Sequence, residues 1–152
     1  MALNSFTPNT KIESSKVNAN FTNLSDHARW ITFEWRFAGT LTIQTSKDYK
    51  DTPDNVTWER CDLIVDTVPT GATIIVDIER SVDGGATWVT IFTGGTNRPL
   101  IAAGARTGST TTIDIPTATA NGHRFRAKIS QVGSTIAGAD LTVTLKGKYN
   151  LD

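Results

Sequence analysis

The segment Ala72–Phe92, ATIIVDIERSVDGGATWVTIF, decides the fold class of this chain. Two apolar, β-branched runs, Ile74–Ile78 and Trp88–Phe92, flank the polar stretch Val82–Ala86. The two glycines after Asp83 accept positive φ without a Cβ penalty, and the Asp83 carboxylate can accept hydrogen bonds from backbone amides ahead of it. The pattern therefore predicts a β-hairpin, and with it a β fold.

The alternation of apolar and polar residues recurs on both sides of the hairpin. Residues 30–37 alternate large apolar side chains with Thr32, Glu34 and Arg36, which gives one apolar face and one face able to form salt bridges. Further strands are expected at Leu41–Ile43, Val56–Asp66, Leu100–Ile101, Thr111–Ile115, Arg124–Gln131 and Leu141–Tyr149. About eight strands with turns between them predict an antiparallel β-sandwich of jelly-roll type, with a small barrel as the alternative. The polar stretch Ser46–Asn55 is expected to be a surface loop.

The N-terminal residues differ from the rest of the chain. Leu3 and Phe6 are isolated apolar residues around Pro8, which predicts an extended arm. Between residues 10 and 29, a possible capping box and a narrow apolar stripe predict one short amphipathic helix, with its stripe at Val17, Phe21, Leu24 and Ala28. We therefore expect an arm and helix over residues 1–29, used for assembly and anchoring, and a β domain over residues 30–152.

Composition excludes several classes of function. The chain has 152 residues, enough for one domain with a core of its own, and its 15 basic residues balance 15 acidic ones. No basic stripe suits a nucleic acid, and no apolar run is long enough to insert in a membrane. The N-terminus lacks the pattern of a secretory signal, so we expect synthesis in the cytoplasm. The single cysteine, Cys61, is expected to be a buried apolar residue.

The hairpin turn carries a recognisable motif. Ser81–Trp88 matches the Asp-box pattern S-x-D-x-G-x-T-W and resembles the repeated hairpin motif of sialidases. In that family the motif is a structural turn repeated around a propeller, whereas this chain has one copy and is too short for several blades. The motif therefore predicts a stable turn rather than glycoside hydrolysis.

Two acids in the hairpin also have both a catalytic and a structural interpretation. Asp77 and Glu79 point to one face of their strand, about 7 Å apart by strand geometry, a separation within reach of paired glycosidase carboxylates. A half-exposed strand has the same pattern, and Arg80, Arg124 or Arg126 can pair with these acids. We favour ion pairing.

Metal and cofactor sites find little support. His27 and His123 have no cysteine or acid at zinc-ligand spacing, and no nucleophile elbow or phosphate-binding glycine loop occurs, so we expect no enzyme and no cofactor. The acidic stretch Asp48–Asn55 could hold calcium through oxygen ligands, but its spacing is not that of an EF-hand. A solvated loop is the favoured interpretation.

The four tryptophans suggest two roles. Trp35 and Trp58 share the apolar phase of their strands, which predicts core positions. Trp30 and Trp88 lie at the ends of predicted elements and could face a ligand or a partner. A carbohydrate-binding module would use Trp88, Trp30 and Tyr49 against glycans of a host surface, and this is the alternative function.

The N-terminal run Phe6–Leu24, FTPNTKIESSKVNANFTNL, resembles the start of structural proteins of tailed bacteriophages. The segments Arg98–Gly104 and Ile129–Val143 are similar to the closing part of small jelly-roll domains in phage tail, fibre and decoration proteins. The resemblance implies a non-enzymatic virion component, used in capsid decoration or in tail or fibre attachment. It also implies that the chain binds itself, as a homotrimer, and other virion proteins. The residues expected to contact these partners are Leu3, Phe6, Ile12, Val17, Phe21, Leu24 and Trp30.

Overall fold

The computed structural model describes residues 14–15, 17–20, 29–53, 55–93, 95–115, 117–118 and 122–150. The chain divides into two compact units, Met1–Trp30 and Ile31–Asp152. In the first unit, residues 14–15 and 17–20 are helical, inside the range predicted for a helix. In the described part of the chain, no helix has the length and apolarity needed to cross a membrane. Five of the expected partner-binding residues lie outside the described residues, namely Leu3, Phe6, Ile12, Phe21 and Leu24.

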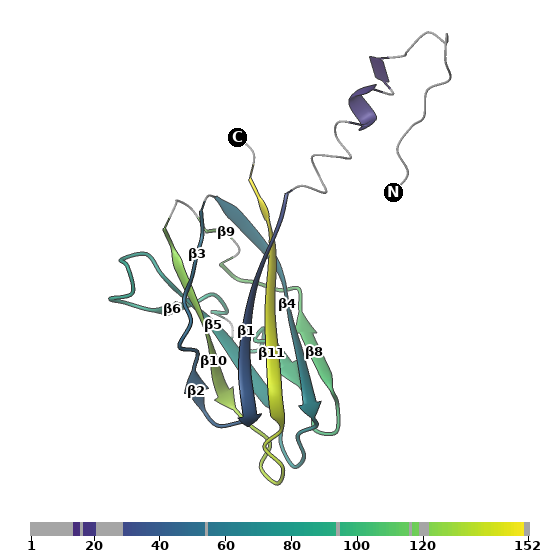
Figure 1. The fold of residues 1–152 in the computed structure, drawn as a ribbon, viewed down its shortest axis with the longest axis vertical. Helices are drawn as coiled ribbons and strands as arrows, with labels where there is room; N and C mark the ends of the chain where they lie inside the picture. The colour runs from purple at the N-terminus through teal and green to yellow at the C-terminus, as the bar shows by residue number, and fades with distance from the viewer. Residues whose placement is uncertain are drawn as a thin grey trace. The chain divides into compact units, whose positions relative to one another are not determined.

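The second unit is built from strands that form two antiparallel sheets (Figure 1). Sheet A has the order β1-β11-β4-β8, with β9 also beside β4, and sheet B has the order β2-β10-β5-β6, with β3 also beside β10 and β7 beside β5. The strands of sheet A are β1 (Trp30–Thr40), β4 (Val56–Thr67), β8 (Thr107–Thr110), β9 (Thr117–Ala118) and β11 (Ala139–Tyr149). Those of sheet B are β2 (Gln44–Thr45), β3 (Lys50–Asp51), β5 (Ile74–Ser81), β6 (Val89–Thr90), β7 (Leu100–Ile101) and β10 (Arg124–Gln131).

These two sheets confirm the predicted all-β sandwich. Two separate sheets also distinguish it from the small barrel, in which one sheet closes on itself. The chain passes repeatedly from one sheet to the other: β1 lies in sheet A, β2 and β3 in sheet B, β4 in A, β5 to β7 in B, β8 and β9 in A, β10 in B and β11 in A. The jelly-roll type remains our interpretation of this path.

The core lies between the inward faces of both sheets. Along β1, Phe33, Trp35 and Phe37 are buried and the residues between them are exposed, as the alternation predicts. Trp58 of sheet A packs against Phe33, with ring centroids 5.0 Å apart, and against Phe125 of sheet B, at 5.2 Å. Both tryptophans predicted for the core are therefore confirmed there, with Trp35 1% and Trp58 2% exposed. Burial of one such side chain contributes about 2–3 kcal/mol.

Cys61 also lies in this core and is fully buried, as predicted. Burial, and secondarily the charge of Asp62, raises the pKa of its thiol far above the ordinary value. The thiol is therefore protonated, and Cys61 behaves as a small apolar residue.

Three local predictions were wrong. Leu41–Ile43 is not a strand, because β1 ends around Gly39, whose φ is 73°, and Ile43 is exposed. The strand expected at Thr111–Ile115 lies earlier, at Thr107–Thr110. The sequence does not show an alternating pattern in this strand, because Gly108 has no side chain. Glycine is needed at this position, since the strand approaches β7 so closely that a Cβ at Gly108 would overlap the Leu100 carbonyl.

The stretch Ser46–Asn55 is not entirely a surface loop either. Lys50 and Asp51 form β3, which pairs with Phe125 and Arg124 of β10. Thr52 is buried, and both its backbone N–H and its hydroxyl donate to the His123 carbonyl, at 2.9 and 3.2 Å. Pairing with the sandwich edge therefore orders the middle of this stretch.

Candidate functional site

The Asp-box turn joins β5 to β6 and has the hydrogen bonds of a rigid reversal. The predicted hairpin is confirmed, because Glu79 and Arg80 pair with Thr90 and Val89. Asp83 Oδ1 accepts the Thr87 backbone N–H at 2.9 Å, and Asp83 Oδ2 accepts the Thr87 hydroxyl at 2.6 Å. The two glycines after Asp83 have φ of 75° and 103°, as predicted.

These hydrogen bonds stabilise the ionised form of Asp83. The Thr87 hydroxyl, the Thr87 amide and then the Ser81 hydroxyl, which donates at 2.7 Å, lower the pKa of Asp83 well below 3.8. Ser81 Oγ itself accepts the Gly85 amide at 2.8 Å. The carboxylate therefore serves as the acceptor at the centre of the turn, which supports the structural interpretation of the motif.

Trp88 folds back over sheet B. Its indole N–H donates to the Gly85 carbonyl at 3.0 Å, and the Arg126 guanidinium lies 4.0 Å from the centre of its ring. Tyr49 stacks on the same indole with centroids 5.4 Å apart, and the Arg124 guanidinium lies 5.9 Å from the Tyr49 ring. We call Tyr49, Trp88, Arg124 and Arg126 the aromatic stack. Tyr49 is half-exposed at 51%, and Trp88 is partly buried.

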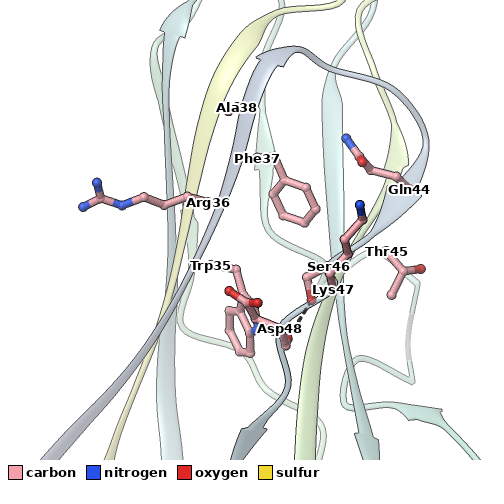
Figure 2. Close-up of a pocket in the computed structure, with 9 residues that line it drawn as sticks. All are labelled: Trp35, Arg36, Phe37, Ala38, Gln44, Thr45, Ser46, Lys47 and Asp48. Carbon is pink, nitrogen blue, oxygen red and sulfur yellow. Dashed lines mark hydrogen bonds between the residues drawn. The ribbon is translucent and has the colours of Figure 1, made fainter.

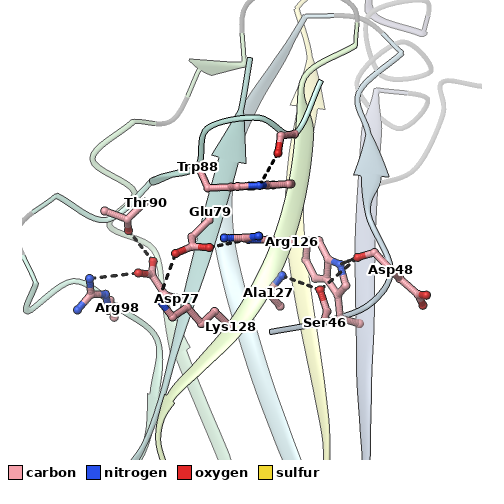
Figure 3. A network of polar contacts seen from close by, with 12 residues as sticks. Ser46, Asp48, Asp77, Glu79, Trp88, Thr90, Arg98, Arg126, Ala127 and Lys128 are labelled. Atoms are coloured by element: carbon pink, nitrogen blue, oxygen red, sulfur yellow. Dashed lines mark hydrogen bonds and ion pairs between the residues drawn. The ribbon is translucent and has the colours of Figure 1, made fainter. Parts of the chain in front are cut away.

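Below the stack lie the two acids singled out from the sequence (Figure 3). Asp77 and Glu79 are 5% and 9% exposed, so the expectation of a half-exposed strand was wrong. They point away from the core, but Trp88, Thr90 and Arg98 from the segment that follows the hairpin turn contact or cover this face of sheet B. These acids are thus buried by contacts with a later segment of the chain and not by the pattern of their own strand.

Each carboxylate oxygen of the pair has a partner. Asp77 Oδ1 accepts the Thr90 hydroxyl at 2.5 Å, and Asp77 Oδ2 lies 3.1 Å from Arg98 Nη2. Glu79 Oε2 lies 2.6 Å from Arg126 Nε, and Glu79 Oε1 lies 3.4 Å from Lys128 Nζ. We call these six residues the ionic cluster. Such saturation suits a structural ion-pair network better than an acid–base pair, which needs an oxygen directed at a substrate.

The partners of the acids were only partly predictable. Arg126 pairs with Glu79, as expected, whereas Arg124 pairs with Asp51 at 3.1 Å. Arg98 was missed, because it lies 21 positions after Asp77 in a segment without strand signals. The signal for such a partner is that an acid at an outward-facing position is buried. This burial is visible only in the three-dimensional structure.

The described residues provide no obvious metal site. Among them, no group of three histidine, cysteine or acidic side chains is arranged to hold an ion, but Asp54 of the acidic stretch lies outside that part of the chain, as does His27. His123 is 9% exposed, and its Nδ1 has no hydrogen-bond partner within the described residues. Burial, and then the charge of Arg80, lowers the pKa of His123 below 6.5.

The described residues line several grooves on the outside of the sandwich, two of which bear on a candidate site. The first, which we call the edge groove, has a volume of about 280 Å³ and is lined by Trp35–Ala38 of β1 and by residues 44–48 (Figure 2). The second, of about 540 Å³, lies on sheet A over β4 and β8 and includes Ile64, which is half-exposed. Both are open surface depressions suited to a macromolecular contact rather than an enclosed ligand.

The sequence-predicted glycan residues are partly brought together. Tyr49 and Trp88, far apart in the sequence, form the stacked pair. Trp30, 47% exposed, is the first residue of β1 in the other sheet. Among the expected partner-binding residues, Val17 is partly buried within the helical residues 17–20.

Comparisons with known proteins give a distant structural likeness. No protein-family model matches the chain, and no curated protein matches it. A solved structure titled "Cyanophage Pam1 capsid asymmetric unit" is similar, with a TM-score of 0.38 and 17% identity over 80% of this chain and 84% of that chain. This likeness is too distant to establish a shared function, so the proposals below rest on the residues of this chain.

Proposed function

We propose that this chain is a non-enzymatic structural component of a tailed-phage virion, in capsid decoration or in tail or fibre attachment. It associates with itself, as a homotrimer, and attaches to other virion proteins through residues 1–29. The similarity of Phe6–Leu24 to the start of phage structural proteins provides the virion context.

The observation that carries this proposal is that Met1–Trp30 forms a compact unit of its own. Below about 40 residues a chain rarely buries enough apolar surface to be stable without a disulfide, a metal or a neighbouring subunit. This segment has no cysteine, and its large apolar residues are few: isolated ones in the predicted arm and a narrow stripe on the predicted helix. Contacts with neighbouring subunits would provide the apolar surface that it lacks.

The ionic cluster supports the non-enzymatic part of the proposal. The two acids that suggested hydrolysis have all four oxygens engaged by Thr90, Arg98, Arg126 and Lys128. A network of this kind stabilises the outer layer of a domain, and it supports a structural role for these two acids rather than one as general acid or base.

Deletion of residues 1–29 tests the proposal. We expect the remaining chain to keep its sheet circular-dichroism spectrum and to be lost from purified particles, measured by mass spectrometry of particle proteins. Phe21→Asp on the predicted apolar stripe should act in the same direction, and Ala19→Asp, at an exposed helical position, is the matched control. Normal incorporation of the truncated chain would contradict the proposal.

A glycan-binding module is the second candidate, and the aromatic stack favours it. An aromatic ring that is half-exposed and supported from behind can stack on the apolar face of a sugar, and Tyr49 is such a ring. Binding on a glycan array that is lost in Tyr49→Ala, with folding unchanged, would support this function. Trp88→Ala is a less selective variant, because Trp88 also packs on Arg126.

A further inference from the structure

Strand β1 differs from every other strand at the margin of a sheet in the described part of the chain. It is the end strand of sheet A, it has 11 residues, and its sheet partner is β11. The other marginal strands have two residues each, except β8, which has four. Native proteins keep free edges short because unpaired N–H and C=O groups recruit other strands. A long free edge therefore indicates a place where pairing is completed.

A groove lies beside part of this edge. The edge groove separates residues 35–38 of β1 from residues 44–48, and Figure 2 shows Arg36 pointing away from that groove. Glu34 and Arg36 project outward with side-chain exposures of 44% and 77%, and they pair with each other at 2.8 Å. Neither side chain is bound by the sandwich beneath it. Both can therefore exchange this exposed ion pair for an ion pair with another chain.

We propose that β1 pairs antiparallel with β1 of a second copy of this chain, about a two-fold axis at Trp35, so that sheet A continues across two subunits. Opposite residues in an antiparallel pair project to the same face. Outward residues of one copy must therefore oppose outward residues of the other, which limits the symmetric registers to every second one.

Charge selects one of these registers. With the axis at Trp35, Glu34 lies opposite Arg36 of the second copy, and Arg36 lies opposite its Glu34. A shift in one direction brings the two Glu34 side chains together, and a shift in the other brings the two Arg36 side chains together, which is unfavourable. Trp35 is also the middle residue of β1, so this register alone pairs all 11 residues.

The inward side fits the same register. Phe33 of one copy lies opposite Phe37 of the other, and the two Trp35 residues meet at the axis, so the buried row of one sheet continues into the next. Isologous pairing of this kind needs a self-complementary strand. The segment Phe33–Phe37, FEWRF, meets this need: it has one aromatic residue at the centre, opposite charges on either side of it and phenylalanine at each end.

This interface uses residues outside the segment 1–29, so it stands independently of the proposed function. A trimer formed through residues 1–29 would become a hexamer through β1, and a monomer would become a dimer. In both cases loss of the β1 contact halves the mass of the particle in solution.

A charge-swap experiment on the full-length chain tests the proposal. Glu34→Arg places two arginines and Arg36→Glu places two glutamates on the strand, so each variant alone opposes like charges. We expect each to have half the light-scattering mass of the wild type, and an equimolar mixture to recover the full mass as a heterotypic pair. Arg60→Glu is the matched control, because it reverses one charge of another exposed i, i+2 ion pair, Arg60–Asp62, on β4, which has a neighbouring strand on both sides.

Three outcomes would overturn the proposal. They are a wild-type mass equal to that of either variant, a control variant that loses mass as they do, and a mixture that does not recover the wild-type mass. Circular dichroism of each variant verifies that the sheets are intact.

Discussion

Asp83 shows how one residue can hold a turn through its charge. Its carboxylate accepts hydrogen bonds from Thr87 and Ser81, which lower its pKa below 3.8. Since the folded pKa lies below the unfolded one, this stabilisation is present above the unfolded pKa and is lost only as pH falls through the folded value. The turn therefore keeps its hydrogen bonds in mildly acidic solution.

Thr87→Val tests this account of Asp83. The variant removes the hydroxyl donor and keeps the backbone amide, so the pKa of Asp83 should rise toward 3.8, measured by NMR titration of the carboxyl carbon. Thr32→Val, on exposed β1 surface in the other sheet, is the control and should leave the titration unchanged. An unaltered Asp83 titration in Thr87→Val would show that the hydroxyl does not stabilise the carboxylate.

His123 gives the protein a second pH dependence, of the same sign as that of Asp83 but at higher pH. Burial lowers its pKa below 6.5, so the unfolded chain binds a proton more readily than the folded one. The contribution of neutral His123 to the free energy of unfolding is present above the unfolded pKa of 6.5. It is lost as pH falls toward the pKa of His123 in the folded protein. Urea denaturation should therefore show a lower unfolding free energy as pH drops below 6.5. His123→Gln should have a flatter profile, and equal profiles for both proteins would contradict this assignment.

At the scale of the elements, the outer face of sheet B is a covered layer rather than a free surface. The segment that follows the hairpin turn brings Trp88 and Arg98 onto β5 and β10, where they close over Asp77 and Glu79. Buried acids of this kind are stable only while their partners remain, because an unpaired charge is costly to bury.

Arg126→Leu should therefore be strongly destabilising. It removes the 2.6 Å partner of Glu79 and the cation packed on Trp88, and we expect a loss of about 3–5 kcal/mol in the free energy of unfolding by urea denaturation. Adding Glu79→Leu should recover part of this loss, because it removes a buried carboxylate that has lost its closer partner and keeps only Lys128 at 3.4 Å. A double variant as unstable as the sum of both single ones would show that the two side chains are not coupled.

Local patterns explain which elements could be predicted from sequence. The strands at residues 56–66, 124–131 and 141–149 alternate clearly, and the structure contains them. The hairpin was predictable because its Asp-box turn is a local feature, closed by hydrogen bonds between residues of Ser81–Trp88. The strand at 107–110 was missed because Gly108 has no side chain to show alternation.

The site was less predictable than the fold. The stacking of Tyr49 on Trp88 depends on β3 pairing with β10, which brings a polar stretch beside the hairpin. Likewise, the opposite charges on β1 are visible in the sequence, but only the sheet order shows that this strand is a free edge. Contacts between distant segments decide both features.

At the scale of the whole molecule, the two proposals of association concern two regions. The first is Met1–Trp30, a compact unit of a length that rarely buries enough apolar surface to be stable alone, and the second is β1, an 11-residue end strand of sheet A in the described part of the chain. The acids that suggested hydrolysis are instead enclosed in ion pairs. Self-association is therefore the central claim.

The solution mass of the full-length chain tests this claim most directly. Size-exclusion chromatography with light scattering, run over a range of concentrations, should give a multiple of the 16.4 kDa chain mass. A particle of 16.4 kDa at every concentration would contradict the account.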